Sequence, residues 1–475
     1  MTEAVAPSWR ARPGPVVGAC VLVYLPFALL GYGTDLDVAN VLRAGRSWVD
    51  EGSYDMSRGP GAAVHELGVG LLDHLGGSVL VNLASVGFAA LALWSVFVLV
   101  QRDGGRWPEW SVLVLASNPW FWIAATSLGD FVWALGLLLA GVVFAGAPSG
   151  RAPRSRADTF VAGAGTDPEM AAGGAEAGTS RAAVTVAEVE AEPSPAAVAS
   201  AQGGAEAEPS RTAVASADDG RGRPVLAGVL FGLAIGCRAS SALLVLAWCA
   251  AELIGADGWR MHGRRVAWVG GIALLLGIMC FVPPWWDAGR SLDFIDNELE
   301  FVGFGVHLGR WAVKNLALVG PLAGIVLLLG IPKALAALGR WSTSALVRFS
   351  ALVIIVSELL YFRFPFKPMH LLPVVAATAL LIGASPRVTK RWVAALVVAQ
   401  LIGGLVSATF AAPDVQDAAR SGRVDVSITA GPLLTDVRCR FDDRDLGPWP
   451  DPATLAATER AGVNAACQNR TWRAD

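Results

Sequence analysis

Long apolar blocks separated by short polar stretches are the feature of this 475-residue sequence that most limits its fold. A block of about 18 or more apolar residues predicts a membrane-spanning helix, because the hydrocarbon core of a bilayer is roughly 30 Å thick. Only 16% of the residues are charged, against roughly 25% in soluble proteins. The sequence therefore predicts an all-α, polytopic transmembrane helical bundle of about eleven spans. The blocks are 15–33, 78–100, 110–127, 129–146, 225–238, 240–254, 266–286, 312–331, 345–362, 369–384 and 391–411.

Basic residues between the blocks predict the orientation, because Lys and Arg gather in cytoplasmic loops. With the N-terminus inside, the C-terminus lies outside, and the protein is a multi-pass protein of the cell membrane. The pair 225–238 and 240–254 decides this, since a single span there would invert everything downstream. The residues then placed inside are Arg102, Arg106, Arg260, Arg264, Arg265, Lys333, Arg340, Arg348, Arg387, Lys390 and Arg391.

Composition divides the chain into four regions. Residues 1–146 form an N-terminal membrane half, whose first outer loop is 34–77. Residues 147–223 are rich in Ala, Gly, Glu, Ser and Pro and predict a disordered cytoplasmic insertion. A second membrane half follows at 224–411, and 412–475 form an extracytoplasmic tail.

The tail contains Cys439 and Cys467. An oxidising outer compartment would permit a disulfide between them, and two unrelated thiols are the alternative. The net charge of −3 gives no reason to expect a nucleic-acid partner.

Two acids, Asp35 and Asp37, follow the first span directly. Carboxylates at the outer end of a span lie at the water boundary, where partial desolvation raises the pKa of a carboxyl and makes it a competent base. Solvated helix caps are the plain alternative. We predict Asp35 and Asp37 as catalytic residues.

The rest of the first outer loop adds further polar side chains. The run 38–52 is amphipathic and is expected to lie along the membrane surface. Arg58 lies in a Gly/Pro turn, and His65 and Glu66 open a second amphipathic stretch. A zinc-protease motif would need a second His where this sequence has Val69, so that activity is not expected.

Two ionisable residues lie at the edges of later blocks. Asp130, the third residue that we predict as catalytic, begins the fourth block and faces outward in the predicted topology, although helix capping explains it about as well. Arg238, within GLAIGCRASS, interrupts apolar sequence and must pair with something; a lipid phosphate or an acid of the first outer loop would serve.

The segment 361–373, YFRFPFKPMHLLP, carries Arg363, Lys367 and His370 at the outer side. Cations there run against the usual inside bias. A phosphate at that depth would need such partners, with Arg giving bidentate contacts and Lys a point charge. Snorkelling toward the lipid headgroups is the alternative.

These features together resemble the GT-C superfamily of membrane glycosyltransferases, which use polyprenyl-phosphate-linked sugars and include the protein mannosyltransferases and the aminoarabinose transferase. The acidic pair Asp35 and Asp37, the outward acid Asp130, the GLAIGCR stretch and the cationic segment carry the resemblance. Much of the mannosyltransferase branch has Asp-Glu where this sequence has Asp-Leu-Asp, and the Arg-Tyr-Ala that often follows is missing.

The resemblance implies that a polyprenyl-phosphate sugar donor enters from the bilayer and that its sugar is transferred to a lipid, glycan or protein acceptor outside. Asp35 or Asp37 would take the acceptor proton, and direct displacement would invert the anomeric centre. Arg238, Arg363, Lys367 and His370 would stabilise the departing phosphate. Arg58, His65 and Glu66 would help to bind substrate. Some relatives require a divalent cation and others do not, and paired carboxylates fit either case.

Two other functions remain as alternatives. A transporter or lipid flippase calls for ionisable residues near mid-membrane and broken helices in two related halves. A non-catalytic scaffold predicts no convergence of Asp35, Asp37 and Asp130 with the cationic segment.

Overall fold

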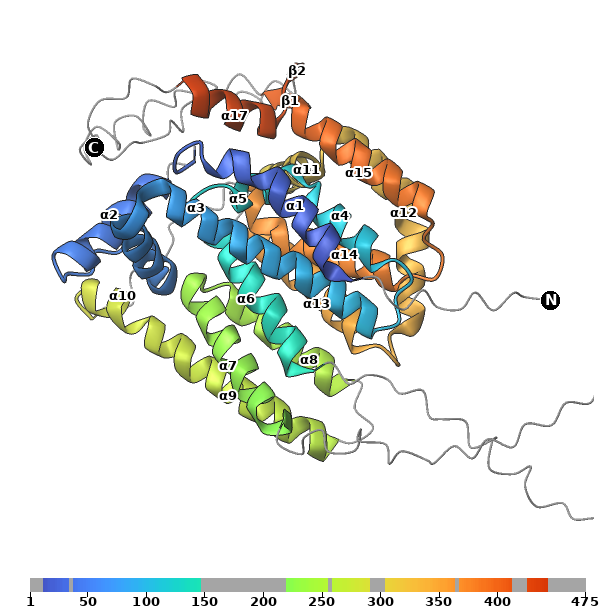
Figure 1. Ribbon diagram of the computed structural model, residues 1–475. Coiled ribbons are helices and arrows are strands. Elements are labelled where there is room, and N and C mark those ends of the chain that lie inside the picture. Colours follow the sequence, from blue (N-terminus) through green and yellow to red (C-terminus); the bar gives the residue numbers. More distant parts are fainter. Residues whose placement is uncertain are drawn as a thin grey trace, which may run out of the picture. The chain divides into compact units, whose positions relative to one another are not determined.

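The computed structural model describes residues 12–33, 37–146, 219–254, 259–290, 304–363, 367–411 and 425–442. The chain is mostly helical, as expected for a helical membrane protein (Figure 1). Asp35, Cys467 and the predicted insertion up to residue 218 lie outside the described residues. The proposed disulfide between Cys439 and Cys467 therefore stays a prediction.

The N-terminal half contains six helices within the described residues: α1 (Pro13–Ala28), α2 (Asp37–Asp50), α3 (Ala63–Arg102), α4 (Pro108–Ala116), α5 (Pro119–Ala125) and α6 (Asp130–Ala145). The amphipathic run of the first loop forms α2, as predicted. The apolar block 110–127 was expected as one helix but is broken into α4 and α5. Helix α4 ends at Ala116, and Asn118 caps α5, because its side chain accepts hydrogen bonds from the backbone of Trp120 and Phe121 at 3.1 Å each.

The C-terminal half continues with α7 (Asp219–Cys237), α8 (Ser241–Ile254), α9 (Trp259–Cys280), α10 (Val282–Asp287), α11 (Phe304–Val319), α12 (Pro321–Leu335), η3 (Ala336–Arg340), α13 (Ala345–Arg363), η4 (Pro368–Leu371), α14 (Leu372–Ala384) and α15 (Lys390–Leu405). The block 312–331, expected as one helix, is broken at Gly320, whose φ of +81° few residues other than glycine adopt.

The apolar blocks 225–238 and 240–254, which decide the orientation of the later spans, form two separate helices, α7 and α8. The chain turns at Arg238, and the far end of α8 is held by a hydrogen bond of 2.7 Å from Arg348 to the carbonyl of Ala251. The orientation of the downstream spans is therefore not inverted by a merged helix.

The tail corrects the all-α prediction. The last apolar block was expected as helix to residue 411, but the helix ends at Leu405. Strand β1 (Val406–Ala411) then pairs antiparallel with β2 (Asp425–Ala430), before α17 (Pro432–Asp442). Val, Thr and Phe in β1 favour an extended backbone over helix.

Burial separates the centre of the bundle from its outer face. Nearly every residue of α6 is buried, whereas α9 and α12 expose large apolar side chains such as Leu274 and Leu329. Within the described residues, four helical segments are long and apolar enough to cross a membrane, and the bent pair α5 and α6 would add a fifth. The count of about eleven spans stays a prediction.

The basic residues assigned to the cytoplasm meet at one end of the bundle. Arg340 pairs with Asp103 at 2.9 Å, and Arg102 donates to the carbonyl of Val143 at 2.6 Å. The Lys390 ammonium lies 4.0 Å from the ring centre of Trp107. The loops that carry these residues therefore lie at the same end of the bundle, as the positive-inside rule predicted. Which side of the membrane this end faces stays a prediction.

Helix α2 packs on α3 through two glycines. A Cβ on Gly70 would lie 2.1 Å from the carbonyl oxygen of Gly45, so neither position has room for a side chain. We expect Gly70→Ala to destabilise the protein by about 1–3 kcal/mol, because the helices must separate. Thermal unfolding in detergent measures this. Gly87→Ala on the same helix is the control, since its added Cβ meets nothing within 4 Å; equal melting temperatures for the two variants would contradict the prediction.

Candidate functional site

Five segments far apart in sequence meet in one chain of charged contacts, which we call the ion-pair chain. Asp37 begins α2, Arg58 lies in the loop before α3, and Asp130 begins α6. Arg238 lies in the turn between α7 and α8, and Lys367 directly precedes η4. Four of them lie at or beside helix ends and Arg58 lies in a loop, so none of these charges is inside an apolar helix.

Arg58 bridges the two carboxylates of the ion-pair chain. Its guanidinium contacts Asp37 closely through one amino group, and the other amino group lies 2.8 Å from Asp130. Arg238 also reaches Asp130 at 2.8 Å, and Lys367 reaches Asp37 at 2.9 Å. The Asp130 side chain is only 2% exposed, against 33% for Asp37. Asp130 is therefore buried between two arginines, and Asp37 is the more accessible carboxylate.

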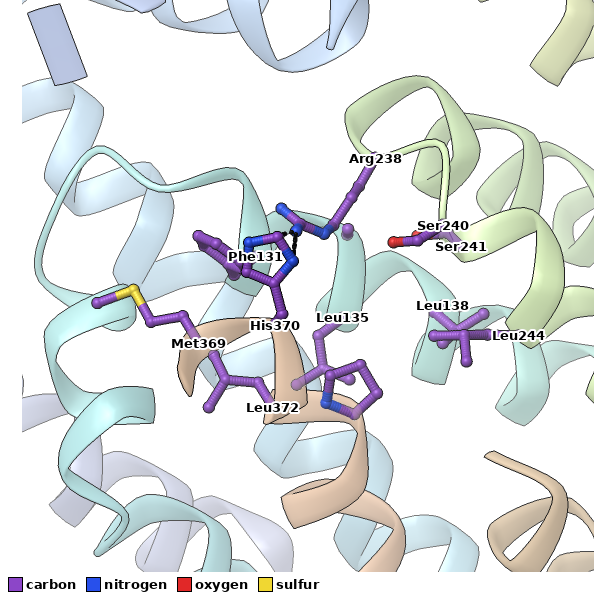
Figure 2. A pocket seen from close by; sticks show the side chains of 12 residues that line it. Phe131, Leu135, Leu138, Arg238, Ser240, Ser241, Leu244, Met369, His370 and Leu372 are labelled. Carbon is purple, nitrogen blue, oxygen red and sulfur yellow. Dashed lines mark hydrogen bonds between the residues drawn. The ribbon is translucent and has the colours of Figure 1, made fainter. Parts of the chain in front are cut away.

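Arg238 also links the ion-pair chain to a pocket (Figure 2). Its second amino group lies 2.7 Å from Nδ1 of His370, and its guanidinium carbon lies 4.1 Å from the ring centre of Phe131. The pocket lies between α6, α8, η4 and the start of α14, and its space of about 330 Å³ includes an opening to solvent. Its lining is Phe131, Ala134, Leu135, Leu138, Arg238, Ser240, Ser241, Leu244, Met369, His370, Leu372 and Pro373.

The pocket has the polar side chains of Arg238, His370, Ser240 and Ser241 together with apolar side chains. Figure 2 shows Arg238 and His370 together on one side, with Leu135, Leu138 and Leu244 lining the rest. Such a site suits a ligand with an anionic head and a hydrocarbon tail. Sequence reasoning identified Arg238 and His370 but missed Phe131, whose signal was its place directly after Asp130.

The cations around Asp37 control its protonation. Burial raises the pKa of Asp37, but the charges of Arg58 and Lys367 outweigh burial and hold that pKa below its ordinary value. Asp37 is therefore ionised at neutral pH and can accept a proton. Its pKa is lowered, however, and not raised as the sequence predicted, so the cations make it a weaker base than an unpaired carboxylate. Its ion pairs stabilise the fold above the carboxyl's unfolded pKa, and that contribution is lost as the pH falls through the lower folded pKa.

We expect Lys367→Met to raise the pKa of Asp37, because one of its two cations is removed. The acidic limb of the activity profile should then move to higher pH than in wild type. Initial transfer rates measured across acidic pH test this shift. Lys390→Met is the control, because that lysine lies beside Trp107, away from the ion-pair chain; an unmoved limb in Lys367→Met would contradict the assignment.

Two loop residues predicted to bind substrate face the protein interior instead. Glu66 is 0% exposed and accepts hydrogen bonds from its own loop, including one of 2.5 Å from the Tyr54 hydroxyl. His65 is also fully buried and stands edge to face against Trp133, with ring centres 5.0 Å apart. Neither side chain is open to a ligand in this arrangement. Arg363 is exposed at the last residue of α13.

The described carboxylates do not form a metal site. Within the described ranges, no group of three or more His, Cys, Asp or Glu side chains is arranged around a common point. Asp37 and Asp130 are instead engaged by guanidinium and ammonium groups. A divalent cation therefore stays a prediction that the described residues do not test.

No protein-family model matches the sequence, and no curated protein matches it. Among solved structures, the chain is similar to the apo oligosaccharyltransferase of Archaeoglobus fulgidus, with 11% identity, a TM-score of 0.44, and coverage of 98% of this chain and 60% of that one. The same archaeal enzyme with an inhibitory peptide and a dolichol-phosphate gives 12% identity, a TM-score of 0.39, and coverage of 97% and 60%.

This chain spans 60% of the length of that enzyme. A TM-score of 0.44 carries no assignment of activity, so the function proposed below depends on the residues of the ion-pair chain and the pocket beside it.

Proposed function

We propose that this protein transfers a sugar from a polyprenyl-phosphate-linked donor to an acceptor hydroxyl on the extracytoplasmic side of the cell membrane. The observation that carries the proposal is the ion-pair chain beside an apolar pocket. A carboxylate able to accept a proton and cations able to receive a phosphate meet there, although they come from separate parts of the sequence.

The pocket matches both parts of such a donor. Leu135, Leu138 and Leu244 offer an apolar wall for isoprenoid units. Arg238 and His370 at the polar side are placed for a phosphate, because a guanidinium forms paired charge-assisted hydrogen bonds with phosphate oxygens. Figure 2 shows these two side chains in direct contact above the apolar residues.

The charge of the site also supports an anionic ligand. In the ion-pair chain, the three cations Arg58, Arg238 and Lys367 face the two carboxylates Asp37 and Asp130. These three cations are the groups that the oxygens of a phosphodiester would contact there.

The reaction follows from these positions. The acceptor oxygen forms a bond to the anomeric carbon while Asp37, or Asp35 outside the described residues, takes the hydroxyl proton. The bond from that carbon to the phosphate oxygen breaks, and polyprenyl phosphate leaves with the electron pair. Arg238 and Lys367 stabilise the added negative charge on the phosphate. A single displacement of this kind inverts the anomeric centre.

The topology belongs to the same proposal: about eleven spans, with the N-terminus inside and the site and tail outside. Two observations support it. The predicted cytoplasmic cations gather at one end of the bundle. From the tail, Arg440 of α17 donates to the carbonyls of Phe27 and Thr126 at 3.1 and 2.9 Å, at the ends of α1 and α5 opposite those cations.

A transporter or flippase remains the alternative, and the site geometry favours it less. The charged residues lie at helix ends or in a loop rather than at mid-helix positions, where a transport pathway would need them. A scaffold is disfavoured because the acids and the cationic segment do converge, through the ion pair of Asp37 and Lys367.

The test is transfer of radiolabelled sugar from a panel of polyprenyl-phosphate sugars in membranes that contain the protein, compared with membranes that lack it. We expect labelled lipid, glycan or protein product together with released polyprenyl phosphate, and opposite anomeric configurations in donor and product. Movement of intact labelled donor across proteoliposomes, without product, would support the flippase instead and reject the transferase.

A further inference from the structure

The loop segment Tyr54–Gly61 carries Arg58, which bridges both carboxylates of the ion-pair chain. An arginine side chain is long and flexible, so its reach to two targets depends on where its backbone is held. The backbone groups on either side of Arg58 have specific partners, and two of these are carboxylates that no step of the proposed reaction uses.

The first carboxylate is Glu66, in the first turn of α3. It accepts hydrogen bonds from the Ser57 backbone at 3.2 Å, from the Ser57 hydroxyl, and from the Tyr54 hydroxyl at 2.5 Å. Glu66 is 0% exposed, and a buried charge is tolerated only with such partners. Its three bonds fix the residue directly before Arg58.

The second carboxylate is Asp287, at the end of α10 and more than two hundred residues further along the chain. It accepts a hydrogen bond of 3.0 Å from the backbone N–H of Met56. Pro284 of the same helix packs so closely on Gly61 that a Cβ there would lie 2.6 Å from its ring. Gly61 in turn donates 2.6 Å to the carbonyl of Arg58 and has a φ of +87°, which favours glycine.

We propose that Glu66 and Asp287 are positioning residues that together hold the backbone of Arg58, so that its guanidinium reaches Asp37 and Asp130 at once. Glu66 holds Ser57 and Asp287 holds Met56, so consecutive residues are fixed from two different helices. The expected effect on catalysis rests on the proposed function. The hydrogen bonds that hold the backbone at Met56 and Ser57 are a property of the fold, and their effect can be measured separately.

Hydrogen exchange tests whether Glu66 and Asp287 hold this backbone, without any assay of activity. In the full chain in detergent, Glu66→Gln and Asp287→Asn should each speed amide exchange in peptides covering Met56 and Ser57, while the core of α6 stays protected. Asp55→Asn is the matched control, because Asp55 is the neighbouring residue but its carboxylate pairs with Arg43 on the exposed side. Unchanged exchange in both positioning variants would overturn the proposal.

Transfer rates test whether Glu66 affects catalysis by positioning Arg58. Glu66→Gln should lower kcat by up to about 100-fold, because a misplacement near 1 Å has that effect. The double variant with Arg58→Ala should be no slower than Arg58→Ala alone, because the residue being positioned is already gone. Losses that multiply in the double variant would overturn the proposal. Ser57→Ala, which removes one bond to Glu66, should give a smaller loss if Glu66→Gln fails to fold.

The two proposals fail in different ways. If Arg58→Ala transfers sugar as fast as wild type, the assignment of the catalytic site is wrong, whatever the exchange data show. If Arg58→Ala is inactive but Glu66→Gln and Asp287→Asn match wild type in both exchange and kcat, the site stands and the positioning role is rejected.

Discussion

Asp37→Asn is expected to lower sugar transfer by about 10²–10⁴-fold, the range over which general bases contribute. The amide keeps the shape of the side chain but cannot take the acceptor proton. Asp37 is the more exposed carboxylate of the ion-pair chain, and its lowered pKa keeps it ionised at neutral pH. The measurement is kcat for the wild type and the variant at matched expression, with labelled donor in isolated membranes.

Stability should change little in this variant. Asp37 keeps a third of its side-chain surface exposed, and partly exposed ion pairs contribute roughly 0–1 kcal/mol. Asp50→Asn at the other end of α2 is the control, since Asp50 is half exposed and lies 3.4 Å from His74. Transfer that survives Asp37→Asn would rule this residue out as the base; loss in Asp35→Asn would then move that role to Asp35.

Asp130→Asn is expected to lower both stability and transfer. The free energy of unfolding should fall by roughly 3 kcal/mol, near the low end for breaking a buried ion pair because both arginines keep some exposure. Two guanidiniums would face each other without the carboxylate that lies 2.8 Å from each. Transfer per folded molecule should fall by about 10²–10³-fold, since the cations that receive the phosphate lose their alignment.

Thermal unfolding and transfer, measured on the same detergent preparation, separate the two effects. Asp436→Asn is the matched control, because Asp436 is also buried and pairs with Arg440 at 2.8 Å, in α17. That variant should lose stability but keep transfer per folded molecule. Full transfer by folded Asp130→Asn would show that Asp130 does not align the cations.

The sequence by itself determined the helical membrane class and the set of charged residues at the site. Long apolar blocks leave the backbone no partner in lipid except its own helix, so composition and length were enough. Arg238 and Lys367 were identifiable because a charge at the edge of apolar sequence must pair, and each pairs with an acid of the predicted set. The gathering of Arg102, Arg340 and Lys390 at one end of the bundle was also predictable, since the bias in Lys and Arg is local to each loop.

Helix boundaries were predicted less well where a single residue or a short strand interrupts an apolar block. The blocks 110–127 and 312–331 are each broken into two helices, at the capping residue Asn118 and at the positive-φ residue Gly320. The end of the last block is strand rather than helix, because pairing with Asp425–Ala430 overrides its apolar composition. Hydropathy measures apolar content and does not register these local alternatives.

Only the tertiary structure decided which charged residues work together. Asp37 and Lys367 are 330 positions apart and lie within 2.9 Å, and no spacing rule reaches across such a separation. Glu66, adjacent to His65 and close to Arg58 in sequence, turns into the protein and holds the loop. Nothing in the sequence indicated that Asp287 of α10 binds the loop that carries Arg58, and only the structure shows this contact. Side-chain direction and long-range pairing depend on how the helices pack, and the sequence reports only what each helix is made of.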